Sequence, residues 1–133
     1  MAVFENGISQ KSEYRKFRIK FKNSPDDYKM IREVLIRRFK NSWPIPDIIV
    51  IDGGKGQLST ALSALKESGI KIPVITIAKK FEEIYYAGKL LPLRLDKKSP
   101  ARQLIQATRD EAHRFALSYH RLLRAKKLYE KIA

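Results

Sequence analysis

Two runs of β-branched and other apolar residues, separated by a glycine-rich segment and a helical pattern, constrain the fold of this chain more than any other feature. The runs cover residues 47–52 and 73–78. Between them, apolar residues recur at helical spacing as far as Ser68-Gly69 (Leu58, Ala61, Leu62, Leu65). Such runs are typical of strands buried on both faces. A strand, a helix and a strand within about thirty residues predict two parallel strands.

The N-terminal part predicts a hairpin followed by a helix. Residues 1–5, apolar except for Glu5, lead into Asn6-Gly7, a dipeptide that favours tight hairpin turns. Residues 17–22 alternate apolar and basic side chains, which predicts a strand with one buried and one basic face. Ser24-Pro25 and the two acids that follow have the composition of a helix start. The helix is expected to end before Pro44.

The C-terminal part predicts a second hairpin and a long helix. Residues 82–86 and 90–95 flank Gly88 with apolar, strand-like segments, and Ser99-Pro100 begins a helical pattern that continues close to the C-terminus. We therefore predict one α/β domain over residues 1–133, in which helices flank a mixed sheet.

The charge of the chain narrows its partners. Twenty-eight Lys and Arg against 14 Asp and Glu give a formal net charge of +14, which favours polyanions through phosphate neutralisation and counterion release. A merely solvated charged surface is the alternative. Acidic membranes compete as partners, but we find no basic amphipathic helix with a broad aromatic face and no apolar run of membrane-spanning length. The absence of cysteine excludes disulfides, thiol nucleophiles and thiolate metal sites.

Three groups of cations are the candidates for DNA contacts. One group follows the first turn, one lies along the first predicted helix, and one lies in the segments around Asp52 and His113. In this order, the groups are Arg15, Lys16, Arg18 and Lys20; Arg32, Arg37 and Arg38; and Lys55, Arg109 and Arg114. On the first helix they form a predicted basic stripe. The alternative is that these cations are solvated or paired with neighbouring acids such as Glu33.

Asp52 is the first candidate for catalysis. It ends a buried strand at the carboxyl side, where open α/β sheets bind ligands; a helix-capping role is the alternative. The glycines after it allow a phosphate backbone to approach closely, and Lys55 supplies a cation at the start of the next helix. A Walker A loop is excluded because Gly56, rather than Ser or Thr, follows Lys55.

The last helix carries the second candidate, His113. Five polar residues fall on one broad helical face at spacings of three, four and seven (Gln106, Arg109, Asp110, His113, His120). A merely solvated stripe is the alternative. A carboxylate and an imidazole together suit metal-assisted phosphodiester hydrolysis, because the first holds a divalent cation and the second ligates, relays a proton or orients water.

Two eight-residue segments, Ile51–Leu58 and Arg109–Ala116, closely resemble signature segments of UvrC, the incising subunit of bacterial nucleotide excision repair. Shorter segments match in the same order between residues 1 and 124 (Phe4–Gly7, Lys11–Arg15, Asp26–Tyr28, Arg32–Leu35, Arg37–Phe39, Ile77–Lys80, Ser99–Ala101). The chain therefore resembles the C-terminal endonuclease domain of that family.

The resemblance implies an RNase H-like fold that cuts one DNA strand on the 5′ side of a lesion, with Mg²⁺ or Mn²⁺ as cofactor. The family's catalytic set is an Asp on the first strand, the Asp of the glycine-rich segment and the His of the last-helix segment. The last two fall on Asp52, which is also the expected metal ligand, and on His113. Damaged duplex DNA and a UvrB–DNA complex are the implied partners, in the cytoplasm and without a membrane.

The sequence departs from the family at its start. The family's first Asp lies in a segment resembling Phe-Asp-Ile-Ser-His, and no such segment precedes residues 1–4, which correspond to the second strand. The chain is thus expected to be either a fragment or a stand-alone paralogue lacking the first strand. We expect that it binds DNA but does not cut it alone. A catalytically silent, RNase H-like nucleic-acid-binding module is the alternative.

Overall fold

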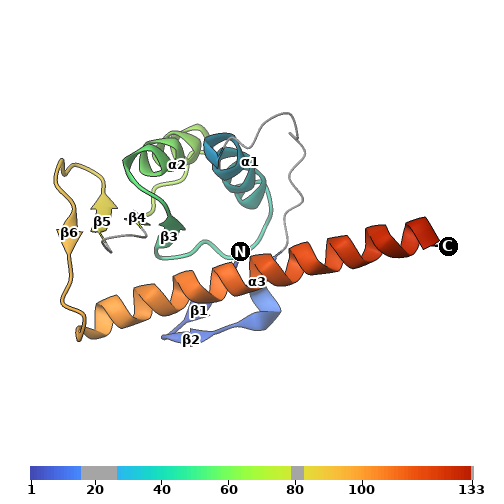
Figure 1. Ribbon diagram of the computed structural model, residues 1–133. Coiled ribbons are helices and arrows are strands. Elements are labelled where there is room, and N and C mark those ends of the chain that lie inside the picture. The colour runs from blue at the N-terminus through green and yellow to red at the C-terminus, as the bar shows by residue number, and fades with distance from the viewer. Residues whose placement is uncertain (16–26, 79–82, 133) are drawn as a thin grey trace. The chain divides into compact units, whose positions relative to one another are not determined.

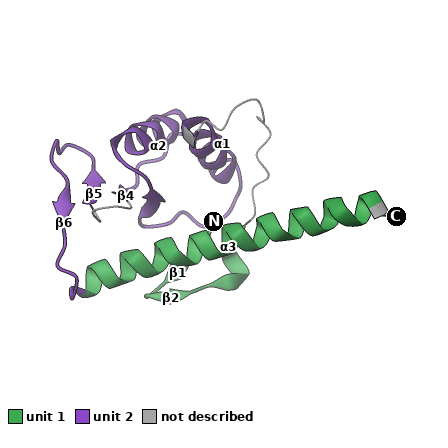
Figure 2. Ribbon diagram, in the orientation of Figure 1, with its two compact units in different colours: residues 1–17, 100–133 green, residues 18–99 purple. Residues whose placement is uncertain are grey.

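The computed structural model describes residues 1–15, 27–78 and 83–132 (Figure 1). The chain divides into two compact units (Figure 2). One contains residues 1–17 and 100–133, and the other contains residues 18–99.

A mixed four-stranded sheet forms the centre of the 18–99 unit. Strand β3 (Ile49–Asp52) runs parallel to β4 (Val74–Ala78), in a register that pairs Asp52 with Ile77. Helix α2 (Lys55–Glu67) connects them, which confirms the predicted strand–helix–strand unit. Strands β5 (Glu83–Tyr86) and β6 (Leu93–Arg94) continue the sheet in antiparallel order, β3-β4-β5-β6, which confirms the second hairpin.

Helix α2 packs its apolar face on this sheet. Ala61 and Ala64 are fully buried there, because their small side chains allow the helix backbone to come close to the strands. Helix α1 (Asp27–Phe39) lies alongside α2 and contributes Leu35 to the same cluster (Figure 1). Burial of a Leu side chain of this kind stabilises a fold by about 1.5–3 kcal/mol.

The burial of β3 differs from the prediction for this unit, and one predicted helix start is not tested. Strand β3 was expected to be buried on both faces, but Ile49, Val50 and Ile51 are only half-buried. The reason is that β3 has a single neighbour, β4, among the described strands. The predicted helix start at Ser24-Pro25 lies outside the described residues.

The other unit combines a small hairpin with a long helix. Strands β1 (Phe4–Glu5) and β2 (Ile8–Ser9) pair around Asn6-Gly7, and both turn residues have positive φ angles, +52° and +79°. This confirms the predicted turn, since a two-residue hairpin loop of this type needs the left-handed region at both positions. A 3₁₀ helix, η1 (Lys11–Glu13), follows. The strand predicted at 17–22 lies outside the described residues.

Helix α3 (Pro100–Ile132) has 33 residues and extends for about 50 Å. Pro100 occupies its first position, where the missing N–H costs nothing, and neither Gly nor Pro interrupts residues 101–132. Despite this length, none of the described helices is apolar enough to cross a membrane.

Candidate active site

Asp52 is exposed and is the last residue of β3. The chain leaves the sheet immediately after it, where the Gly53 N–H donates a hydrogen bond of 2.9 Å to the Ile77 carbonyl of β4. Gly54, rather than Asp52, is the N-cap residue of α2. The carboxylate is therefore held at the carboxyl end of a parallel strand, the edge at which open α/β sheets bind ligands.

Two side chains that the sequence analysis did not single out hold the glycine loop. The Gly54 N–H donates to Gln57 Oε1 at 2.9 Å, and Thr76 Oγ1 donates to the Gly54 carbonyl at 3.1 Å. Both contacts have a sequence signal. Gln57 stands at the N3 position of α2, from which a Gln side chain can accept from the N-cap N–H. Thr76 is a fully buried hydroxyl in an apolar strand, where a partner is required.

Neighbouring side chains occupy the space beside two of the loop's glycines. A Cβ atom on Gly53, whose φ is +158°, would overlap the Gln57 side chain, and a Cβ atom on Gly56 would overlap the Tyr28 hydroxyl of α1. At Gly54 the nearest atom to such a Cβ lies 3.9 Å away. The expected close approach of a phosphate backbone therefore rests on Gly54.

Lys55 begins α2 near three polar side chains of β5 and β6 that contact one another, Tyr85, Glu83 and Arg94. Its Nζ lies 5.9 Å from the centroid of the Tyr85 ring, within cation–π range. The Tyr85 hydroxyl donates to Glu83 at 2.8 Å, and Arg94 donates to the same carboxylate at 2.7 Å. These two hydrogen bonds hold the pKa of Glu83 below its usual value. The hydrogen bond to Glu83 raises the pKa of Tyr85. The hydrogen bonds of Glu83 thus orient the Tyr85 ring, with which Lys55 makes its cation–π contact.

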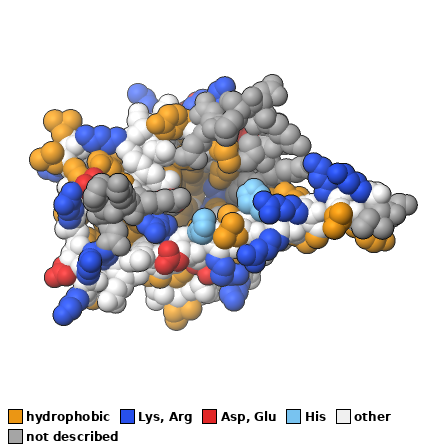
Figure 3. Space-filling model, viewed as in Figure 1, with side chains coloured by type: hydrophobic (Ala, Val, Ile, Leu, Met, Phe, Trp, Pro, Cys, Tyr) orange, Lys and Arg blue, Asp and Glu red, His pale blue; other side chains and the backbone are white. Residues whose placement is uncertain are grey.

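The second candidate lies on α3. His113 and His120 are both exposed and are two helical turns apart, and the two histidines show on the same face of the molecule (Figure 3). Arg109 forms an ion pair of 3.8 Å with the adjacent Asp110. The predicted polar face is thus present on a continuous helix.

Tyr14 fastens the N-terminal hairpin segment to α3. Its hydroxyl donates to Glu111 at 3.2 Å, and its ring meets Phe115 edge to face at 5.1 Å. Arg114 binds Glu111 through two hydrogen bonds, of 2.6 and 3.0 Å. Arg114 lowers the pKa of Glu111, whereas burial, followed by the Glu111 contact, raises the pKa of Tyr14. Glu111, on the turn that carries His113, is therefore an anchor.

Replacement of Glu111 with Gln should flatten the acid limb of the stability profile. The pKa of Glu111 is below its ordinary 4.5 in the folded chain. A carboxyl with a lowered pKa contributes stability above its unfolded pKa, and that contribution is lost as the pH falls through the folded pKa. We therefore expect the parent to lose more unfolding free energy than Glu111→Gln below about pH 4.5.

Urea unfolding at a series of pH values measures this difference. Glu130→Gln, an exposed position on the same helix, is the matched control and should keep the profile of the parent. Parallel profiles for the parent and Glu111→Gln would show that the anchor contributes nothing.

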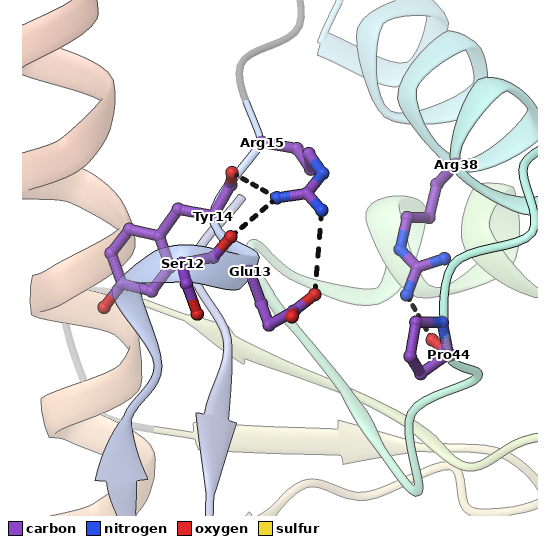
Figure 4. A network of polar contacts seen from close by, with 6 residues as sticks. All are labelled: Ser12, Glu13, Tyr14, Arg15, Arg38 and Pro44. Atoms are coloured by element: carbon purple, nitrogen blue, oxygen red, sulfur yellow. Dashed lines mark hydrogen bonds and ion pairs between the residues drawn. The ribbon is translucent and has the colours of Figure 1, made fainter.

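Of the cations predicted to contact DNA, some are held by contacts within the chain and others lie outside the described residues. Arg15 is folded back on its own turn, where it donates to the Ser12 and Tyr14 carbonyls at 3.0 and 2.9 Å and pairs with Glu13 at 3.6 Å (Figure 4). Arg114 is bound to Glu111, as described. Lys16, Arg18 and Lys20 lie outside the described residues.

On α1, the predicted stripe is wrong for one residue. Arg38 is only 7% exposed and donates to the Pro44 carbonyl at 2.6 Å (Figure 4). Its guanidinium also lies 5.2 Å from the ring centroids of both Phe39 and Trp43. It supports the end of the helix rather than an open surface. Arg37 pairs with Glu33 on the previous turn, at 3.9 Å, and Arg32 pairs with Glu67 of α2.

The described residues bring no three His, Cys, Asp or Glu side chains together. Asp52 offers the oxygen ligand that Mg²⁺ or Mn²⁺ prefers, but one carboxylate does not complete a site for such an ion. Asp52 and His113 belong to different compact units, so their joint role in catalysis stays a prediction.

Comparison with known proteins identifies this combination of fold and motifs. The family model of the UvrC RNase H endonuclease domain matches residues 1–117, which include both candidate segments. The chain belongs to the UvrC endonuclease family. The mixed sheet with its flanking helices is thus RNase H-like, a class of nuclease domain that depends on metal ions in general.

Relatives of the same name in three organisms support this family assignment. The UvrABC system protein C of Chlorobium chlorochromatii is 51% identical over 129 residues, which cover 94% of this chain and 20% of the relative. The proteins of the same name from Methanococcus maripaludis and Dictyoglomus thermophilum are 50% and 49% identical, with 94% and 96% of this chain covered and 24% and 22% of each relative. The chain thus spans about a fifth of the length of these relatives.

Proposed function

We propose that this chain is the DNA-cutting domain of a nucleotide excision repair nuclease, which hydrolyses one phosphodiester bond on the 5′ side of a lesion in damaged duplex DNA. The observation that carries the proposal is the exposed Asp52 at the carboxyl end of β3, within the glycine segment that resembles the UvrC signature.

Each candidate residue has a separate role. Asp52 contributes one carboxylate to a Mg²⁺ or Mn²⁺ site that needs further ligands, and the ion supplies charge stabilisation and an activated water when bound. His113 moves a proton or orients water. Lys55 and the open backbone at Gly54 receive a phosphate beside Asp52.

The chain acts as part of a larger assembly. Because relatives named UvrABC system protein C are about five times longer, we propose that this domain cuts DNA presented by UvrB, in the cytoplasm. Residues 1–133 form one functional domain in this view. A catalytically silent nucleic-acid-binding module is the second candidate, and the lack of a three-ligand cluster among the described residues favours it.

A graft tests the proposal. In the Chlorobium chlorochromatii relative, the segment that matches this chain is replaced by this chain, and 5′ incision is measured on a duplex with one lesion bound by UvrB. We expect incision within about tenfold of the ungrafted relative, because half of the residues are identical. A folded graft that binds DNA and never cuts would favour the silent module.

A further inference from the structure

A hollow of about 350 Å³ lies between α1 and α2, within the unit that carries Asp52. Three residues of each helix line it (Tyr28, Lys29, Arg32; Ser59, Thr60, Ser63). None of these α2 residues was singled out in the sequence, and only Arg32 was expected to contact DNA. The hollow is distinct from the glycine loop, because Ser59 follows Lys55 by one full turn.

The hollow exists because the two helices present side chains of unequal size. Tyr28 crosses α2 at Gly56, where a Cβ atom would overlap its hydroxyl. Beyond that contact, α2 offers three short hydroxyl side chains opposite the long Lys29 and Arg32 of α1. A larger apolar residue at Ser59 or Ser63 would fill the space and favour the helix more.

The chemistry of the lining is that of a phosphate site. Two cations and four residues with hydroxyl groups, Tyr28 among them, line the hollow, and no carboxylate is among the described residues that line it. Lys, Arg, Ser and Thr are side chains that contact nucleic-acid phosphates and sugars.

Arg32 can exchange its present partner, the Glu67 carboxylate, for another anion. Its ion pair with Glu67 joins side chains that are 41% and 56% exposed, and exposed pairs of this kind contribute little to stability. A phosphodiester group, whose two non-bridging oxygens share one negative charge, can therefore replace the Glu67 carboxylate in a charge-assisted pair.

We propose that the hollow binds the phosphodiester backbone of DNA, as a second contact besides the glycine loop. The proposal rests on the proposed function, because it assumes a DNA substrate. Ser59 lies about 6 Å along the α2 axis from Lys55, so a strand held by the hollow is positioned relative to Asp52 by the helix itself. The contact is independent of base sequence.

Three double variants of the 133-residue chain test the proposal, each titrated with a short fluorescent duplex at several salt concentrations. Lys29→Gln/Arg32→Gln removes the two cations of the hollow. Lys66→Gln/Lys71→Gln removes two exposed cations elsewhere in the unit and is the matched control for net charge. Ser59→Ala/Ser63→Ala removes hydroxyls only, without loss of helix propensity.

The slope of log K against log salt distinguishes the outcomes. Loss of two phosphate contacts should make the slope shallower by about 1.8 for the hollow variant, while the control keeps a slope close to that of the parent. The Ser variant should bind about tenfold more weakly at an unchanged slope. Equal slopes for hollow variant and control, or a hollow variant that binds like the parent, would overturn the hollow alone. A parent that binds no duplex would overturn the hollow as a DNA contact, whereas the proposed function is tested by incision with the graft.

Discussion

Asp52→Asn in the grafted nuclease should lower the rate of 5′ incision by about a thousandfold or more. The amide keeps the shape of the carboxylate but lacks its charge, so it is a poor ligand for a divalent cation, and the loss of such charge stabilisation costs several kcal/mol in the transition state. Asp52 is exposed at the end of β3, so the substitution should not disturb the fold. Initial rates on the lesion duplex measure the effect.

Asp47→Asn is the matched control for this experiment. Asp47 is an exposed aspartate just before β3 in the same unit, and its replacement changes the net charge equally. We expect the control to cut at the rate of the parent and both variants to bind duplex DNA with unchanged affinity. Incision by Asp52→Asn at the rate of the control would remove Asp52 from the catalytic set.

The position of Asp52 could be predicted because it depends on local patterns. The β-branched run before it, the glycines after it and the helix up to Gly69 place it at a strand end, and the parallel direction of β3 and β4 follows from the crossover. Gly69, at φ +71°, ends α2 as the Ser-Gly pair predicted. Strand burial was less predictable, because a run of Ile and Val does not report how many neighbours a strand has.

Contacts between distant segments were beyond this kind of prediction. Tyr14 and Glu111 are 97 residues apart, and no periodicity within either segment reveals that they meet. Thr76 and Gly54 are similarly linked across 22 residues. For this reason the role of Glu111 emerges only from the structure, although it lies inside a segment that the sequence analysis singled out.

Arg38 shows a signal that was present and misinterpreted. A basic side chain was assigned to the polar side of α1 by its type. Its spacing indicates the opposite, because Arg38 follows Leu35 by three residues and Ile31 by seven, which places all three on one helical face. The long aliphatic part of an Arg side chain can be buried when its guanidinium reaches a carbonyl, and Pro44 provides that carbonyl.

Arg38→Ala should therefore destabilise the chain by about 2–3 kcal/mol, through loss of the packed side chain, its hydrogen bond to Pro44 and its contact with Trp43. For a chain of this size, that loss corresponds to a decrease in Tm of about 6–12 °C. Arg37→Ala, at the half-buried neighbouring position, removes a 3.9 Å ion pair with Glu33 and should cost less, about 1 kcal/mol. Thermal and urea unfolding of both variants measure these differences.

DNA titration, well below the melting temperatures of Arg37→Ala and Arg38→Ala, compares the contributions of the two residues to DNA binding. If Arg37 meets a phosphate and Arg38 does not, Arg37→Ala should make the salt slope shallower by about 0.9, while Arg38→Ala keeps the slope of the parent. The two variants remove the same charge from adjacent positions, so a general field cannot produce different slopes. A stable Arg38→Ala variant with a shallower slope would restore Arg38 to the DNA-binding surface and contradict the buried role that its contacts assign to it.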